Sequence, residues 1–208
     1  MASYGSPSRP RLGKQGLPRK LGPTRSSLKV WKRADNRGAF SAENAERQMV
    51  GLVSLVPQVV DAVSVPVVAT GGITDGRGIA AALILGASAV QIGTGFLRCP
   101  EAKLPPAYVS RLAATEAHET VITRAFSGRA GRSVATDYVQ SANDATAPPA
   151  APYPVQRGLT RAMREAAVKT GDPERMQMWA GQSAKFAQDK PAGALCQQLW
   201  NDAMHLLS

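Results

Sequence analysis

The sequence has few cysteines and no long apolar run. Its two cysteines, Cys99 and Cys196, are too few for a disulfide framework and stand in no metal-binding spacing. No stretch approaches the ~18 consecutive apolar residues of a membrane span, and the start has no apolar core of a secretory signal. We therefore expect a reduced, cytoplasmic protein without membrane contact.

Acidic residues are scarce at one end only. The net charge is +10, and the first 37 residues hold ten Lys or Arg and one Asp. The rest is nearly neutral. Residues 1–36 are rich in Pro, Gly and Ser and match no helix or strand period, so we expect a disordered basic arm. A transit peptide would need an amphipathic apolar face, and a nucleic-acid arm would need more stacking aromatics than Tyr4 and Trp31, so no nucleic-acid partner is expected.

A strand, a helix and a second strand are predicted in the middle of the chain. The apolar runs at 65–73 and 89–94 have the length of buried strands, and the segment 75–86 between them allows three helical turns. Near-continuous apolar strands predict a parallel sheet covered on both faces. Asp75 is expected to cap the helix and Gly86 to end it. The chain is therefore predicted to be an α/β protein.

Glycines stand at the carboxyl ends of both predicted strands. Gly71 and Gly72 follow the first, and Gly93 with Thr94 follows the second. Backbone amides there can donate to an anion without hindrance from a Cβ. One Gly-Gly pair would be an ordinary turn. Two such turns in register, with the Thr94 hydroxyl beside them, predict phosphate binding, which in (β/α)8 barrels often follows strands seven and eight.

The flanking regions are predicted to be mainly helical. The expected elements are a helix at 43–63 broken near Pro57, a helix at 107–120, a strand at 121–126, a loop at 144–154, a helix at 159–169, a helix from Pro173 through 185, and a last helix at 191–207. In the last helix, Leu195, Leu199, Trp200 and Leu206 are expected to face inward.

The run VPVVATGGITDGRGIAAALILGASAVQIGTGFLRCPEA (65–102) resembles the C-terminal part of nitronate monooxygenases, also called 2-nitropropane dioxygenases. The motifs SGRAGR (127–132) and MWAGQSA (178–184) extend the resemblance over about residues 37–208. It implies an FMN-binding TIM (β/α)8 barrel, of which the last βα units occupy 37–98, and a small helical or mixed second domain with C-terminal helices at 99–208. A whole barrel needs about 250 residues, so we expect only its C-terminal part.

The resemblance also implies a cofactor site and a reaction. FMN contacts are carried over to Gly71, Gly72, Gln91, Ile92, Gly93, Thr94 and Gln182, although Gln182 can equally lie on a helix surface. The implied reaction oxidises an alkyl nitronate or nitroalkane with O2 to a carbonyl compound and nitrite. A related FMN reductase of the enoyl reductase type and a non-catalytic flavoprotein fragment are alternatives.

No catalytic residue is predicted in this chain. The family's base is the His of a GGH motif, and the matching position holds Asn36, whose amide cannot accept the proton. His118 and His205 are expected to be ordinary surface residues, Arg77 a solvated helix residue, and Cys99 a buried thiol.

The residues before position 37 fit a shifted reading frame. In the family this region reads like GADAIIAQGLEAGGH. Synonymous codons for Arg25 to Asp35 can be chosen that encode IIAQGLEAGG when read from the third base of the first codon, and its Glu is forced by Trp31 followed by Lys32. We therefore interpret residues 1–36 as an out-of-frame translation, biological or from a sequencing error. Their positive charge then carries no information about a partner.

Overall fold

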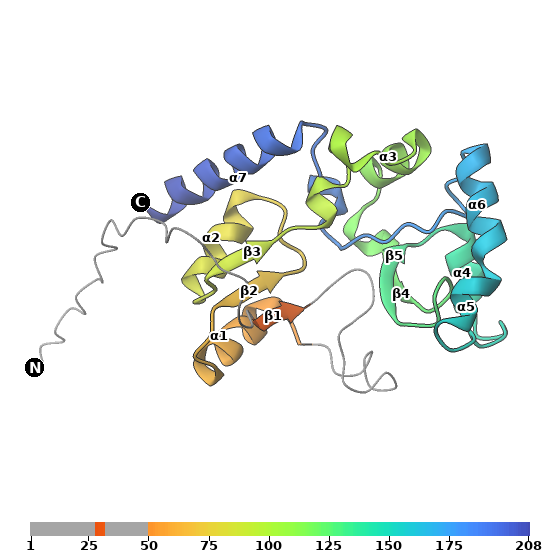
Figure 1. Cartoon of the computed structure of the whole chain (residues 1–208), viewed down its shortest axis with the longest axis horizontal. Helices are drawn as coiled ribbons and strands as arrows, with labels where there is room; N and C mark the ends of the chain where they lie inside the picture. The colour runs from red at the N-terminus through yellow and green to blue at the C-terminus, as the bar shows by residue number, and fades with distance from the viewer. Residues whose placement is uncertain (1–27, 32–49) are drawn as a thin grey trace, which may run out of the picture.

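A three-stranded parallel sheet forms one part of the molecule (Figure 1). The computed structural model describes residues 28–31 and 50–208. Strands β1 (Leu28–Trp31), β2 (Val67–Thr70) and β3 (Ala89–Gln91) lie in that order across the sheet. Thr70 is in register with both Trp31 and Gln91, so the three strands end at one edge. The α/β class is confirmed, and within the described residues the sheet does not close into a barrel.

Strand β1 corrects the expectation that residues 1–36 contain no strand. Its sequence, LKVW, contains residue types that suit a strand. Pairing with β2 supplies backbone hydrogen bonds that so short a segment cannot make alone. The remainder of the expected arm, including Asn36, lies outside the described residues.

Two helices accompany the sheet. Helix α1 (Leu52–Ala62) starts after Val50 and Gly51, which are not helical, so the helix expected at 43–63 is wrong at these two positions. Pro57 lies inside α1 and does not break it, because packing of the fully buried Val56 holds the helix against the core. Helix α2 (Gly76–Ile84) follows β2 as predicted.

Strand β3 is more open than its apolar sequence predicts. Ala89 and Gln91 are exposed and Val90 is half-buried, whereas β2 is mostly buried. The reason is its position, since β3 is an edge strand with one neighbour within the described sheet, whereas β2 is the central strand. The expectation of strands buried on both faces therefore holds better for β2 than for β3.

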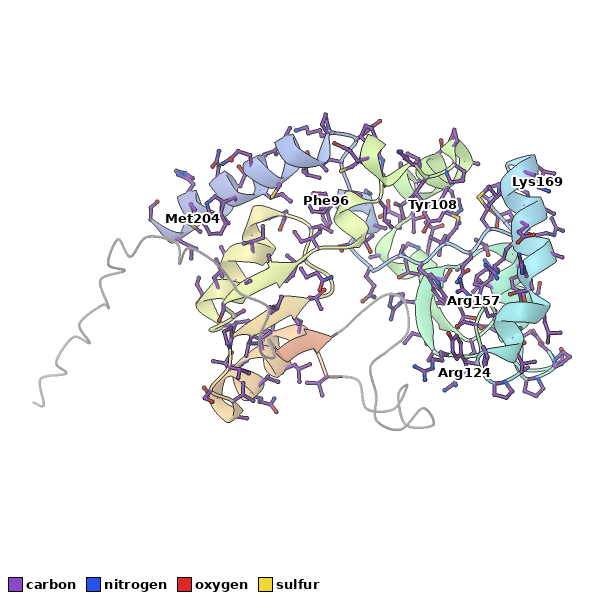
Figure 2. The ribbon with its side chains drawn as sticks, viewed as in Figure 1. Phe96, Tyr108, Arg124, Arg157, Lys169 and Met204 are labelled. Atoms are coloured by element: carbon purple, nitrogen blue, oxygen red, sulfur yellow. The ribbon has the colours of Figure 1, made fainter. Side chains whose placement is uncertain are left out.

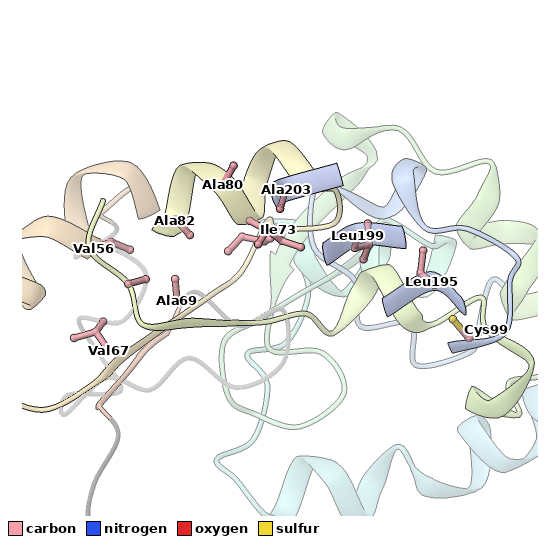
Figure 3. Packing of buried hydrophobic residues seen from close by; sticks show 12 residues of the cluster. Val56, Val67, Ala69, Ile73, Ala80, Ala82, Cys99, Leu195, Leu199 and Ala203 are labelled. Carbon is pink, nitrogen blue, oxygen red and sulfur yellow. The ribbon is translucent and has the colours of Figure 1, made fainter. Parts of the chain in front are cut away.

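The C-terminal helix α7 (Ala192–Leu207) packs along α2 and completes the first hydrophobic core (Figure 3). A Cβ added to Gly76 would lie 2.5 Å from Asp202 Cβ, which shows how closely the two helices approach. Leu195 and Leu199 face the core as predicted. Trp200 and Leu206 do not face the core, since 50% and 55% of their surfaces are exposed. The buried face of α7 is therefore narrower than expected.

A second part of the chain has its own core around a small antiparallel sheet. Tyr108, labelled in Figure 2, donates a hydrogen bond to the Trp179 carbonyl at 3.1 Å within this part. The short turns η1 (Thr94–Phe96) and η2 (Pro100–Ala102) lead into this part, and Phe96 still packs against the first core. The elements of the second part are α3 (Pro106–Ala113), η3 (Ala117–Glu119), β4 (Thr120–Thr123), β5 (Gly131–Val134), α4 (Asp137–Asn143), α5 (Val155–Leu159), α6 (Arg161–Thr170) and η4 (Ala184–Phe186). The predicted helix at 107–120 thus stops at Ala113. The one predicted at 159–169 corresponds to α6, which begins two residues later, at Arg161. The loop at 144–154 is confirmed.

The segment predicted as a helix from Pro173 through 185 consists of turns at both ends and a non-helical stretch between them. Its residues 178–180 lie beside β5: Val134 N donates to Met178 O at 3.0 Å, and Ala180 N donates to Arg132 O at 3.2 Å. These long-range hydrogen bonds satisfy the backbone in place of helical ones. Only the short η4 turn is helical in this stretch.

Candidate functional site

The carboxyl ends of β2 and β3 are held side by side. Thr70 and Gln91 are register partners, and Thr70 Oγ1 donates a hydrogen bond to the Gln91 carbonyl at 2.8 Å. Gly71 and Gly72 follow the first of these residues, while Ile92 and Gly93 follow the second. The structure therefore brings both predicted glycine turns to one edge of the sheet.

The first glycine turn has a backbone conformation that requires glycine, and both turns border open space. Gly71 and Gly72 have φ values of 107° and 76°, which L residues with a Cβ rarely adopt. An added Cβ at Gly72 or at Gly93 meets no described atom within 4 Å. Gly93 also precedes η1, where first-turn amides lack intrahelical partners and can donate outward. These features fit an anionic group such as a phosphate.

The helix between the two turns is capped as predicted. Gly78 N donates to Asp75 Oδ1 at 2.9 Å, and Arg77 pairs with the same carboxylate. Burial opposes ionisation of Asp75, but the hydrogen bonds from Gly78 and Arg77 and the charge of Arg77 outweigh it, so its pKa lies below the usual value. The Arg77 side chain is 75% exposed, which confirms it as a solvated helix residue.

A cavity of about 300 Å³ opens beside Gly71 and Gly72, and we call it the strand-end cavity. Its wall is mostly apolar, and α1 and α2 together contribute six of the lining residues. It is lined by Leu52, Val53, Val56, Gly71, Gly72, Ile73, Gly78, Ala81, Ala82, Leu85, Ile122, Arg132, Gly181 and Gln182. Three residues predicted to contact a cofactor, Gly71, Gly72 and Gln182, therefore meet at one cavity.

The other predicted contacts lie outside the strand-end cavity. Gln91 and Gly93 are exposed, and Ile92 and Thr94 are half-buried. Thr94 is nevertheless joined to the cavity, because its Oγ1 accepts a hydrogen bond from Gly181 N at 2.9 Å. The predicted contacts thus form two adjacent groups, one at the cavity and one at residues 91–94. The hydrogen bond between Gly181 and Thr94 connects them.

Gln182 lies in a turn that precedes η4, so its placement on a helix surface is wrong. The turn is exposed at Gln182 and buried at Ser183. A residue in a turn at a cavity can present both its backbone and its side chain to a ligand, whereas a helical residue presents its side chain alone.

Sequence reasoning assigned no role to Arg132, Ile122 or Gly181, all of which line the strand-end cavity. Arg132 belongs to the SGRAGR motif, and its Nη1 donates to the Thr120 carbonyl at 2.6 Å. The motif was the only signal, because nothing local in the sequence places β4 and β5 beside Gly71. These residues bring one cation and one apolar side chain to the site.

The remaining candidates stay outside the site. His118 and His205 are exposed, as predicted. Cys99 is buried, and that burial together with the charges of Glu101 and Asp189 raises the pKa of its thiol, which disfavours the reactive thiolate. The described part of the chain contains no cluster of three metal-ligating side chains. None of its helices is long and apolar enough to cross a membrane.

Comparison with known proteins gives one consistent family. The nitronate monooxygenase family matches residues 35–202. The probable nitronate monooxygenase of Staphylococcus aureus (strain Newman) is 38% identical over 174 residues, which are 83% of this chain and 48% of the relative. That of strain JH9 is 37% identical over the same extent.

Solved structures agree with these relatives. The nitroalkane oxidase from Streptomyces ansochromogenes superposes with a TM-score of 0.74 at 38% identity, covering 83% of this chain and 50% of that one. FabK from Thermotoga maritima superposes with a TM-score of 0.63 at 31% identity, covering 76% and 50%. The chain therefore spans about half the length of the proteins that it matches.

Proposed function

The chain belongs to the nitronate monooxygenase family, and we propose that it is the C-terminal, flavin-binding part of an FMN-dependent enzyme. The enzyme would oxidise alkyl nitronates with O2 to carbonyl compounds and nitrite. The observation that carries the proposal is the pairing of two glycine turns at one sheet edge, fixed by the hydrogen bond from Thr70 to Gln91. Strands β2 and β3 would be the last two strands of a (β/α)8 barrel. Two unpaired cysteines support a cytoplasmic location.

The residues present fit FMN in chemical type. Gly72 and Gly93 border open space, and the amides there and at Gly71 and Thr94 would donate to the phosphate. Backbone groups of Gln91 and Ile92 lie at the same edge. Gln182 would meet the cofactor from the turn across the strand-end cavity. When bound, FMN would carry the electrons between nitronate and oxygen.

Arg132 offers a charge suited to the proposed substrate. A nitronate is an anion, and a guanidinium in an apolar cavity attracts an anion more strongly than one in water does. The chain has no base at the position matching the family His, because Asn36 stands there. We therefore expect this chain to act on preformed nitronates and not on neutral nitroalkanes, from which a proton must first be removed.

The test is flavin binding followed by product analysis. The full chain is titrated with FMN, and the complex is then given ethyl nitronate or neutral nitroethane under air. Nitrite release from the nitronate supports the proposal. FMN binding without nitrite release from either compound would identify a non-catalytic flavoprotein fragment, and no FMN binding would refute the cofactor assignment. The nucleotide sequence across codons 20–40 tests the out-of-frame interpretation separately.

The likeness to FabK favours one second candidate, an FMN reductase of the enoyl reductase type. It would share the glycine turns and use a nicotinamide as electron donor. Consumption of NADH or NADPH with an enoyl thioester in the absence of O2, without nitrite release from ethyl nitronate under air, would favour this reductase over the monooxygenase.

A further inference from the structure

The Thr94 hydroxyl joins two segments that lie 87 positions apart in the sequence. Its Oγ1 accepts the N–H of Gly181 at 2.9 Å. Thr94 begins η1 shortly after β3, while Gly181 and Gln182 line the strand-end cavity. A hydroxyl has one proton and two lone pairs, so this contact leaves the proton free to be donated elsewhere.

Gly181 links the antiparallel sheet to the segment that follows β3. Ala180 N donates to Arg132 O at 3.2 Å and so belongs to the antiparallel sheet. Its neighbour Gly181 donates its N–H to Thr94, which follows strand β3 of the parallel sheet. Further along, Arg98 Nη1 donates to Ala187 O at 2.9 Å. The segment 181–187 is therefore attached at both ends to residues that follow β3.

We propose that Thr94 is a positioning residue that holds the turn carrying Gln182 at the strand-end cavity. The Thr94 hydroxyl would then couple two contacts with the cofactor, phosphate binding at the strand ends and the flavin contact of Gln182. The flavin part of the inference rests on the proposed function, whereas the hydrogen bond to Gly181 does not. Thr94 would thus affect the whole cofactor, beyond any contact that its proton makes with the phosphate.

The hydrogen bond is tested first in the cofactor-free full chain. Amide hydrogen exchange of Gly181 is measured in Thr94→Val, which keeps the side-chain shape and removes the hydroxyl. We expect exchange roughly fivefold faster, the effect of losing one ordinary hydrogen bond. Thr94→Ser should restore the slow exchange. Unchanged exchange in Thr94→Val would overturn the proposal.

Thr170→Val is the matched control for this substitution. It removes another hydroxyl that bonds to backbone, from Thr170 Oγ1 to the Ala166 carbonyl at 3.1 Å, at the end of α6. Thr170 does not line the strand-end cavity. We expect exchange at Gly181 and flavin affinity to remain at the level of the unchanged chain. An equal effect of both substitutions would show a general loss of stability and would contradict positioning by Thr94.

Riboflavin separates positioning from phosphate binding, because it carries the flavin ring without the phosphate. A residue that only contacts the phosphate would leave riboflavin affinity unchanged when altered. We expect Thr94→Val to weaken riboflavin binding about fivefold and FMN binding at least as much. Gln182→Ala should cost less affinity in the Thr94→Val background than alone, since coupled residues are not additive. Unchanged riboflavin affinity or full additivity would overturn the proposal.

The two hypotheses can fail separately. If the unchanged chain binds neither flavin, the proposed function and the flavin part of this inference are both wrong, while exchange at Gly181 still reports on the hydrogen bond. If the chain binds FMN and Thr94→Val leaves exchange and riboflavin affinity unchanged, the flavin site stands and the positioning role is refuted.

Discussion

Thr70 and Gln91 are joined by a hydrogen bond from the Thr70 hydroxyl to the Gln91 carbonyl at 2.8 Å, across the ends of adjacent parallel strands. This bond supplements the backbone ladder at the place where both strands give way to glycine turns. It therefore helps to fix the spacing of Gly72 and Gly93 before any ligand arrives.

Thr70→Val should lower stability and flavin affinity together. Thr70 is only 6% exposed, and the substitution leaves a carbonyl without this partner, at a cost of about 1 kcal/mol. Urea unfolding of the full chain measures the change. Thr70→Ser, which keeps the hydroxyl, should lower the free energy of unfolding by less. Equal stability of the Val variant and the unchanged chain would show that the bond is unimportant.

Gly72→Ala should abolish or strongly weaken FMN binding. The position has a φ of 76°, which costs a residue with a Cβ about 1 kcal/mol, and the new methyl group would occupy the open space proposed for phosphate. Fluorescence titration with FMN measures the affinity.

Gly171→Ala is the matched control for that substitution. Gly171 has a φ of 70°, also has open space around it, and ends α6 away from the sheet edge. It should lose similar stability and keep FMN affinity. Comparable affinity losses in both variants would attribute the effect to backbone strain and remove Gly72 from the cofactor site.

Gly76→Ala should destabilise the contact between α2 and α7. The added Cβ would lie 2.5 Å from Asp202 Cβ and 2.8 Å from Ala203 N, so the helices must separate, at a cost of about 1–3 kcal/mol. Thermal unfolding measures the loss. Gly193→Ala meets no described atom and lies in the first turn of α7, so it should not lower stability. A Gly76 variant as stable as the unchanged chain would contradict the close packing.

Asp75→Ala should cost about 1 kcal/mol at pH 7 and less in acid. The folded-state pKa of Asp75 is lowered, so the stability that its charge contributes is present above the unfolded pKa, near 3.8, and is lost as the pH falls through the folded value. Unfolding free energies of the variant and the unchanged chain should therefore converge below about pH 4. Asp75→Asn keeps a capping oxygen without the charge, and its own capping contribution should not vary with pH. A difference between the Ala variant and the unchanged chain that is the same at pH 7 and pH 3 would contradict the role of the charge.

The strand–helix–strand unit could be predicted because its signals are local. Two apolar runs, the capping carboxylate of Asp75 and the glycine after α2 determine strands and helix boundaries through contacts a few residues apart. Parallel pairing then follows from the order of elements, and it brings both glycine turns to one edge.

The tertiary structure alone decided what depends on distant partners. Strand β1 exists through pairing with β2, the 178–180 segment is extended because it pairs with β5, and Trp200 is exposed because α2 covers only one stripe of α7. Likewise, Arg132 reaches the cavity and Gly181 reaches Thr94 across long stretches of sequence. Each of these features depends on which surfaces meet after folding, and that information is not contained in any short window of the sequence.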